Sequence, residues 1–330
     1  MPGTRGVRLT LACLALALAG CRAEGGVSGG APEAAETCDR QCLLVLAASY
    51  IDALTAHDPS AAPLASGAVL VENLRQIRIG EGLWRTAGRA DTDYAIPVAD
   101  EALQQIGWIG LIEVNGNHQL LALRLKVEGG LIVEAEHLAV LPMQGFAANL
   151  SALRPEFGAA IPLANRLDRA QLLEIGASYY DALDENDGAR TPFAADCQLI
   201  SNGIITAGAG AIPPQGVTPT PLRTATDCPG QINSQVFTYI DRIENRRMIA
   251  ADPVTGLVMG FAQFRHSMRN LPYRVTLADG TIAERTRTNL PYDPFDLAAA
   301  HIFKIGPDGQ IHQIETVGLI APLNAPNGWE

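Results

Sequence analysis

One seven-residue phrase occurs twice in this chain and limits what the chain can fold into. ASYIDAL, residues Ala48–Leu54, returns as ASYYDAL, residues Ala177–Leu183, and only the fourth position differs. In both places apolar residues recur at i, i+3, i+4 and i+7 spacing, which predicts an amphipathic helix. Tyr50 and Tyr179 lie at the centre of the apolar stripe, so we expect both side chains to face a core.

Segments beyond the helix phrase also correspond to one another. AVLVENL corresponds to CQLISNG, which aligns Asn73 with Asn202. GLIVEAEHLAVLP corresponds to GQIHQIETVGLIAP, which aligns Glu136 with Glu315. Each copy therefore begins with an amphipathic helix and ends with an alternating strand, and each is too long for a solenoid repeat.

We interpret the copies as two duplicated domains, residues 38–145 and 166–330, joined by a linker at 146–165. Helices come first and antiparallel strands follow, an order that predicts the α+β class with helices packed on one side of a sheet. Turn dipeptides separate the strands, and Asp279-Gly280 predicts a further hairpin inside an insertion at 267–297. The predicted strands are 107–114, 119–127, 235–243, 257–266, 298–305 and 311–320.

The N-terminus has the features of an export signal. Arg5 and Arg8 precede the apolar run Leu9–Ala19, which has the length of a signal-peptide h-region and is too short to span a bilayer. The run ends in LAGC, which resembles the lipobox of bacterial lipoproteins, where the Cys is lipidated and becomes the first mature residue. An ordinary secretory signal with an unrelated Cys is the alternative.

The lipobox resemblance implies removal of residues 1–20 and a lipid anchor on Cys21. Residues 21–37 are rich in Gly and Ala and are expected to be a flexible tether. Arg22 follows the Cys, where an Asp would hold such proteins at the inner membrane of Gram-negative bacteria. The resemblance therefore implies the bacterial cell envelope, at the outer membrane facing the periplasm.

Composition narrows the class of partner. The formal net charge is −11, which argues against nucleic acid and against an anionic membrane face as binding partners. With 48% hydrophobic residues in 330, the chain can bury the cores of two domains of ordinary size.

Four cysteines remain outside the signal and the lipobox. In an oxidising compartment Cys38, Cys42, Cys197 and Cys228 allow three pairings. Cys197 with Cys228 would close a Gly/Pro/Thr-rich loop, and Cys38 with Cys42 would bridge the entrance of the first helix. A zinc site is the alternative, but the chain has no CxxC and no His at ligand spacing nearby, so we predict no metal.

The second copy resembles a known family. CPGQINSQVFTYIDRIENRRMIAADPVTGLVMGFAQFRH, AAAHIFKIGPDGQIHQIE and the terminal NGW are similar to an uncharacterised NTF2-like family of fungal secreted and bacterial proteins. IRIGEGLWRTAG and LLALRLKVEGGLIVEAEH in the first copy look like a partner domain of the same superfamily, which includes the SnoaL-like polyketide cyclases. That family usually carries Glu before the Asn-Gly; this chain has Ser201 there, whereas the first copy keeps Glu72.

The resemblance implies two cone-shaped domains, each with N-terminal helices packed on a curved antiparallel sheet around an apolar pocket. The superfamily contains isomerases, cyclases, dehydratases, lyases and non-catalytic binding modules. Its members also pair through their sheets, so the two domains are expected to pair with each other as a pseudo-dimer.

Strand alternation selects the candidate acidic residues. Glu315 shares a predicted face with Ile311, Val317 and Leu319, and Glu136 has the same kind of apolar neighbours. A carboxylate on an apolar face has a raised pKa and suits a general acid or base near neutrality. The alternative, favoured for Glu136, is a buried Glu that hydrogen-bonds a Tyr or Arg on a neighbouring strand for structure.

Other polar residues are candidates in the second copy. His266 and His301 alternate with apolar residues and could shuttle a proton. Tyr179 and Tyr239 could donate hydrogen bonds to a developing oxyanion, and Asp241 is a second candidate carboxylate. For each of these residues, ordinary packing in a core is the structural alternative.

Further polar and aromatic residues are candidates for ligand binding. Asn202 and Asn73 lie beside predicted strands, and Trp84 supplies aromatic surface together with Tyr94 and Trp108, which suits a ring-containing ligand. The chain has no G-x-S-x-G elbow, no phosphate loop with a Lys and no HExxH. Any catalysis is therefore expected to be cofactor-free proton transfer.

Three hypotheses follow from the sequence. The first is a lyase, isomerase or cyclase that acts on an apolar, ring-containing small molecule by general acid–base catalysis. The second is a non-catalytic module that binds a hydrophobic ligand, and the third is an envelope scaffold. In each case the second domain is expected to be the active one, with Glu315, His266, Tyr179 and Asn202 around its pocket.

Overall fold

The computed structural model describes residues 37–142, 147–211 and 222–330. The predicted signal peptide, Cys21 and most of the predicted tether lie outside the described residues, so the lipid anchor stays a prediction. Residues Ala35–Glu330 form one compact unit. Within the described ranges, no helix is both long and apolar enough to cross a membrane.

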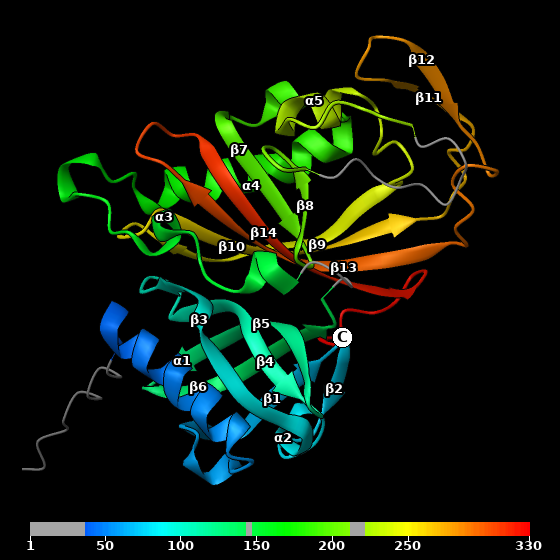
Figure 1. Cartoon of the computed structure of the whole chain (residues 1–330). Helices are drawn as coiled ribbons and strands as arrows, with labels where there is room; N and C mark the ends of the chain where they lie inside the picture. Colours follow the sequence, from blue (N-terminus) through cyan, green and yellow to red (C-terminus); the bar gives the residue numbers. More distant parts are fainter. Residues whose placement is uncertain (1–36, 143–146, 212–221) are drawn as a thin grey trace, which may run out of the picture. The chain divides into compact units, whose positions relative to one another are not determined.

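The N-terminal half packs one long helix, α1, on a six-stranded sheet (Figure 1). Asp39 begins α1 by accepting a hydrogen bond from the Cys42 backbone N–H at 2.8 Å. The strand order is β2-β1-β6-β5-β4-β3; β1 and β6 are parallel and the other neighbours are antiparallel. The elements are α1 (Arg40–Thr55), η1 (Pro59–Ala61), β1 (Leu64–Glu72), β2 (Arg75–Ile77), α2 (Leu83–Thr86), β3 (Ala87–Asp100), β4 (Gln105–Val114), β5 (Asn117–Glu128) and β6 (Leu131–Val140).

The C-terminal half repeats this arrangement under α4. A capping box between Asp168 and Gln171 begins α4. The strand order is β8-β7-β14-β13-β10-β9, with β7 and β14 parallel. The elements are η2 (Ala147–Leu150), α3 (Pro155–Gly158), η3 (Leu163–Asn165), α4 (Arg169–Glu185), η4 (Gly188–Arg190), β7 (Phe193–Ser201), β8 (Ile204–Ala207), α5 (Cys228–Asn233), β9 (Arg242–Asp252), β10 (Leu257–His266), β11 (Tyr273–Thr276), β12 (Ile282–Arg285), β13 (Phe295–Ile305) and β14 (Ile311–Pro322).

The α+β class is confirmed, with two corrections. Both sheets are mixed rather than antiparallel, because the first strand of each half lies beside the last strand and runs in the same direction. Helices are also fewer and sheets larger than expected. Five predicted strands fall within β4, β5, β10, β13 and β14, whereas 235–243 is wrong because β9 begins only at Arg242.

Asn73 and Asn202, which the sequence repeat aligns, have the same structural role in their two halves. Asn73 and Asn202 both adopt φ of +47°, in the left-handed region that Asn tolerates at turns. The amide of Asn202 exchanges two hydrogen bonds with the backbone of Gly318, at 2.8 and 2.9 Å, and Asn73 bonds the backbone of Ala139 in the same way. Both amides are thus occupied by backbone, and they hold the parallel strands of their sheet together.

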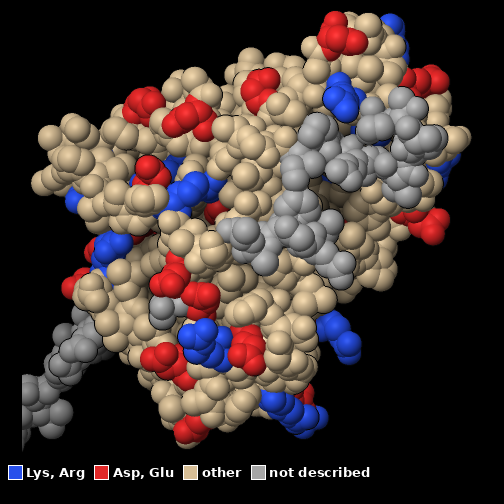
Figure 2. Space-filling model, in the orientation of Figure 1, with Lys and Arg blue, Asp and Glu red and all other residues tan. Residues whose placement is uncertain are grey.

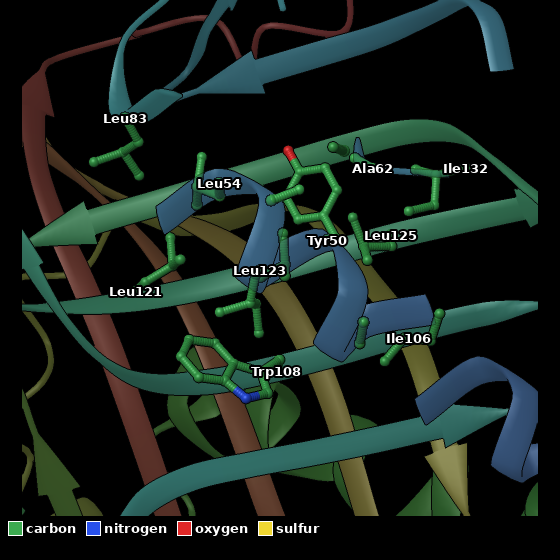
Figure 3. Packing of buried hydrophobic residues seen from close by; sticks show 14 of the residues in the cluster. Tyr50, Leu54, Ala62, Leu83, Ile106, Trp108, Leu121, Leu123, Leu125 and Ile132 are labelled. Carbon is green, nitrogen blue, oxygen red and sulfur yellow. The ribbon is translucent and has the colours of Figure 1, made fainter. Parts of the chain in front are cut away.

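Side chains form three main apolar clusters. The first lies under α1 and includes Tyr50 and Leu54 against the sheet (Figure 3). The second lies under α4 and includes Tyr180 and Phe303. The third combines residues of both sheets, including Ile109, Met259 and Val317 among its members, so the sheet faces opposite the two helices share one core.

Both pairs of cysteines are disulfide-bonded. Cys197 and Cys228 join β7 to the start of α5, as the sequence predicted. Cys38 and Cys42 are bonded at the entrance of α1. Among the described residues there is no group of three or more His, Cys, Asp or Glu side chains that could hold a metal ion.

Candidate functional site

A cavity of about 470 Å³ lies beside α1 in the N-terminal half. Its size falls within the range of small-molecule sites, roughly 300–1,000 Å³. Most of the lining is apolar, with polar groups at a few places. The lining residues are Leu44, Ala47, Ala48, Ile51, Asp52, Thr55, Arg89, Ala90, Asp91, Ala95, Pro97 and Trp108.

The third strand opens this cavity. β3 shifts register against β4 between Ala87 and Ala90 and again between Ala90 and Ala95. Extra residues in one strand bend it and disrupt the ladder locally, so β3 departs from β4 beside the helix. Trp108, from β4, forms part of the wall, and its ring lies at the far end of the core from the Tyr50 hydroxyl (Figure 3).

The corresponding space under α4 is filled. The cavity lined by Tyr179, Phe193 and Ile314, among others, has a volume of only about 10 Å³. That is close to the minimum that holds a single water. Among the described cavities, the one between this helix and its sheet is therefore too small for a ligand.

The one position that differs in the repeated phrase explains part of this contrast. Ile51 lines the open cavity, whereas its counterpart, Tyr180, places a ring in the core. The Tyr180 hydroxyl lies 3.2 Å from Nδ1 of His301, and its ring centroid lies 5.4 Å from that of His301. Phe264 and Phe303 pack against the same ring at 6.2 Å.

Tyr179 and His301 are thus core residues in the structure. His301 is 3% exposed and lies among aromatic rings, and burial lowers the pKa of its imidazole to about 3. Burial also raises the pKa of the Tyr179 hydroxyl. Both side chains face inward as predicted, but they fill the space that a ligand would need.

His266 lies apart from His301. His266 pairs with Phe295 along the β10–β13 ladder, whereas His301 pairs with Gly260, six positions away. The His266 ring stacks on Phe295 at 4.2 Å, and burial lowers its pKa to about 4. The two imidazoles therefore do not converge on one site.

Tyr239 and Asp241 precede β9 instead of lying within a strand, so the alternation proposed for them does not apply. The Tyr239 ring lies 5.0 Å from that of His266, and burial raises the pKa of its hydroxyl to about 12. A carboxylate oxygen of Asp241 accepts a hydrogen bond from the backbone N–H of Ser267.

Glu315 faces the opposite side of its sheet from the one expected. His312 is an extra residue in β14, because Lys304 pairs with Gln313 and Ile305 with Ile311. This bulge reverses the alternation, so Ile311 lies under α4 while Val317 lies in the core shared by both sheets. Glu315 lies two residues before Val317, on the same face of β14, and is directed away from α4.

Glu315 contacts two other parts of the chain. Tyr94 of β3 donates its hydroxyl hydrogen to Glu315 Oε2 at 2.8 Å, and Nη2 of Arg154 lies 2.6 Å from Oε1. Burial raises the pKa of Glu315 to about 7, and the nearby Arg154 and Tyr94 only partly oppose this. The carboxyl group borders a cavity of about 190 Å³ whose lining includes Gln198 and Asn149.

Glu136 occupies the matching position in β6 and is held by arginine. Arg247 of β9 donates from Nη2 to Oε1 at 2.7 Å and from Nη1 to Oε2 at 2.9 Å. Arg124 Nη1 lies 3.8 Å from the same carboxylate. This geometry is the structural alternative stated for Glu136, a buried carboxylate paired with a neighbouring arginine.

Sequence reasoning missed a buried chain of polar groups in the N-terminal half. The Tyr50 hydroxyl lies 2.9 Å from Nε2 of His137, and Nδ1 of His137 lies 3.2 Å from the Glu72 carboxylate. Trp84, a predicted ligand-binding residue, packs edge-on against Tyr50 in this core and is not part of the cavity lining. The one sequence signal for this polar chain was Glu72, which matches the Glu that the family pattern has before Asn-Gly. His137 was not selected, because strand alternation places it on the opposite face from Glu136 and Leu138.

Charges of both signs are mixed on one face of the protein. On the face shown in Figure 2, Lys and Arg are scattered among Asp and Glu instead of gathering in one basic patch. The fold and the cavities together define an α+β protein with two six-stranded mixed sheets and a pocket of small-molecule size beside its first helix.

Each comparison with known proteins that gave a match covers less than half of the chain. Residues 165–318 match a family described as a domain of unknown function (DUF8021), which is less than half of the chain. No curated protein matches the chain significantly.

Several solved structures are similar at low identity. The epoxide hydrolase/cyclase-like enzyme SalBIII, described for its role in pyran ring formation in the polyether salinomycin, is 14% identical with a TM-score of 0.27, over 47% of this chain and 98% of that one. A candidate SnoaL-like polyketide cyclase from Jannaschia sp. CCS1 is 14% identical with a TM-score of 0.25, over 46% and 90%. A ketosteroid isomerase-like protein from Erwinia carotovora atroseptica SCRI1043 is 14% identical with a TM-score of 0.22, over 46% and 98%. At TM-scores this low, we transfer neither activity nor ligand from these proteins.

Proposed function

We propose that this chain is a lipid-anchored envelope protein whose N-terminal half binds a small, apolar, ring-containing molecule beside α1. The observation that carries this proposal is the cavity of about 470 Å³ with an apolar wall and an indole, from Trp108, at its side. Cavities of this kind with a few polar groups are the usual form of small-molecule sites.

The lining favours binding over catalysis at this place. It contains no His, Tyr, Cys, Lys or Glu, and its charged groups are Asp52, Arg89 and Asp91. The buried groups with strongly shifted pKa, Glu315 and His301 among them, border other spaces. The two carboxylates of the lining lie at its wetter positions, since Asp52 is exposed and Asp91 is only partly buried, so the apolar wall favours a binding role.

Two NTF2-like domains that pair as a pseudo-dimer are part of the same proposal. The shared strand order, the helix over each sheet and the matching Asn73 and Asn202 support duplication. Pairing is supported by the core that both sheets share and by the contact of Tyr94 with Glu315. The LAGC sequence at Cys21 supports the anchor.

Filling the pocket tests the binding function. Ile51→Tyr introduces the residue that occupies the counterpart position, Tyr180, and is expected to abolish binding of Nile red, a neutral polycyclic dye, followed by fluorescence. Val45→Tyr adds the same ring on an exposed part of α1 and is the matched control. Equal binding by wild type and Ile51→Tyr, with both folded by circular dichroism, would refute the assignment of the site.

Acid–base catalysis at Glu315 is a second candidate, supported by its position beside the cavity of about 190 Å³ and its pKa of about 7. A carboxyl group with this pKa can both donate and accept a proton at neutral pH. Compounds that raise the melting temperature are tested for turnover by wild type and Glu315→Gln. Turnover lost with binding retained supports catalysis, and absence of turnover in both forms leaves binding as the function.

A further inference from the structure

The cavity beside α1 has a carboxylate in its lining that the protein leaves without a counterion. Asp52 of α1 lines the cavity of about 470 Å³ and is exposed, so it lies where the apolar wall meets solvent. Among the described residues Asp52 forms no ion pair, whereas its counterpart in the repeated phrase, Asp181, does. The two halves therefore differ in charge pairing at one matched position.

The second half shows what lies beside this carboxylate when the space under the helix is closed. Arg246 of β9 reaches α4, where its Nη1 lies 2.8 Å from Asp181 Oδ1 and its Nη2 lies 2.8 Å from Asp184 Oδ2. Asp181 and Asp184 align with Asp52 and Thr55, in the repeated phrase and the residue after it. Both Asp52 and Thr55 line the open cavity. A guanidinium thus occupies, in the second half, the place that borders open space in the first.

The strand that faces α1 supplies no equivalent of Arg246. β3 has the same place in its sheet as β9, at the end of the strand order, but it departs from β4 between Ala90 and Ala95. Arg89 is the one cation in the cavity lining; it is exposed and, within the described ranges, forms no ion pair. Two carboxylates of the lining, Asp52 and Asp91, outnumber it, so the polar side of the cavity favours a positive charge. The residues of β3 in the lining are Arg89, Ala90, Asp91, Ala95 and Pro97.

We propose that the ligand of this cavity is an arylalkyl amine whose ammonium group pairs with Asp52, in the place that the Arg246 guanidinium takes beside Asp181. This inference rests on the binding function proposed above and names the class of ligand. The apolar wall and the Trp108 indole contact the ring, while the carboxylate accepts charge-assisted hydrogen bonds from the ammonium group. The Thr55 hydroxyl donates to the Asp52 carbonyl at 3.1 Å, which leaves its oxygen able to accept a further hydrogen bond from the ammonium group.

Three probes with one naphthalene ring and different charges test this proposal by calorimetry on the purified full chain at neutral pH. They are naphthylmethylamine, naphthylmethanol and naphthoate, which are a cation, a neutral alcohol and an anion. We expect the amine to bind about three- to tenfold more tightly than the alcohol, a modest factor because water weakens an ion pair at an exposed carboxylate. Naphthoate is expected to bind more weakly than the alcohol.

Asp52→Asn is expected to remove the preference, so that the amine and the alcohol bind equally. The ratio of the two affinities cancels any change in how well the cavity holds the ring. Asp181→Asn removes the same charge from the matched position of the second half and should keep the preference of the wild type. As a second readout, salt at about 1 M should reduce the preference of the wild type towards equality, because it screens exposed charges.

Equal binding of amine and alcohol by the wild type, tighter binding of naphthoate than of the amine, or an unchanged preference in Asp52→Asn would overturn the proposal. Loss of the preference in Asp181→Asn would also overturn it, because the effect would then come from overall charge. The amine should not bind to Ile51→Tyr; binding equal to that of the wild type would place it outside this cavity. Binding of the alcohol without preference for the amine refutes only the class of ligand, whereas binding of none of the three refutes the proposed pocket as well.

Discussion

The titration of Glu315 should make the stability of this protein fall as pH rises towards neutrality. Its ordinary pKa is 4.5 and burial raises the folded-state pKa to about 7. The folded chain therefore binds this proton more tightly than the unfolded chain does. The raised pKa of Glu315 contributes about 3 kcal/mol to the free energy of unfolding when the pH is below 4.5. This contribution decreases between pH 4.5 and about 7 and is lost above pH 7.

Glu315→Gln isolates this contribution, because Gln has nearly the same shape and does not titrate; its single amide oxygen can keep the hydrogen bond from one of Tyr94 and Arg154, and this pH-independent loss does not alter the slope. We expect the difference in unfolding free energy, wild type minus variant, to decrease by about 3 kcal/mol from pH 4.5 to pH 8 in urea titrations. Other titrating groups act equally in both proteins and cancel. Glu174→Gln, on the exposed side of α4, is the control and should give a flat difference. A flat difference for Glu315→Gln as well would refute the reasoning.

Two further substitutions test contacts between and within the halves. Arg247→Met leaves Glu136 with only the more distant Arg124, so we expect a loss of about 3 kcal/mol in urea unfolding; a loss below about 1 kcal/mol would mean that the pair behaves as a surface ion pair. Replacing both Cys197 and Cys228 by Ala should lower the unfolding free energy by about 2–4 kcal/mol, and an unchanged denaturation midpoint would contradict this.

Local sequence patterns predicted most of the regular elements. The α1 and α4 phrases and the strands β4, β5, β10, β13 and β14 were predictable because apolar periodicity directly reflects which side chains are buried. β3 was missed, since its Gly, Asp and Pro residues hide the alternation, whereas β9 was placed too early because the β-branched and aromatic residues before Arg242 resemble a strand. The parallel pairing of first and last strands was not predictable, because it joins segments far apart in the sequence.

The candidate site was harder to predict than the fold. Alternation placed Glu315 on the correct strand but on the wrong face, because a single extra residue, His312, reverses every side chain that follows it. The polar chain of Tyr50, His137 and Glu72 was missed because its members come from three separate elements.

By itself, the sequence determined the helix faces and the alternating strands, because these depend on residues close together in the chain, and the repeated segment predicted the duplication. Only the tertiary structure decided which half keeps an open cavity. Ile51 and Tyr180 occupy the same place in a repeated phrase, yet the Tyr ring meets His301 and Phe303 from another strand and fills the space. Whether a cavity is open depends on the volumes of side chains brought together from distant segments, which no local pattern records.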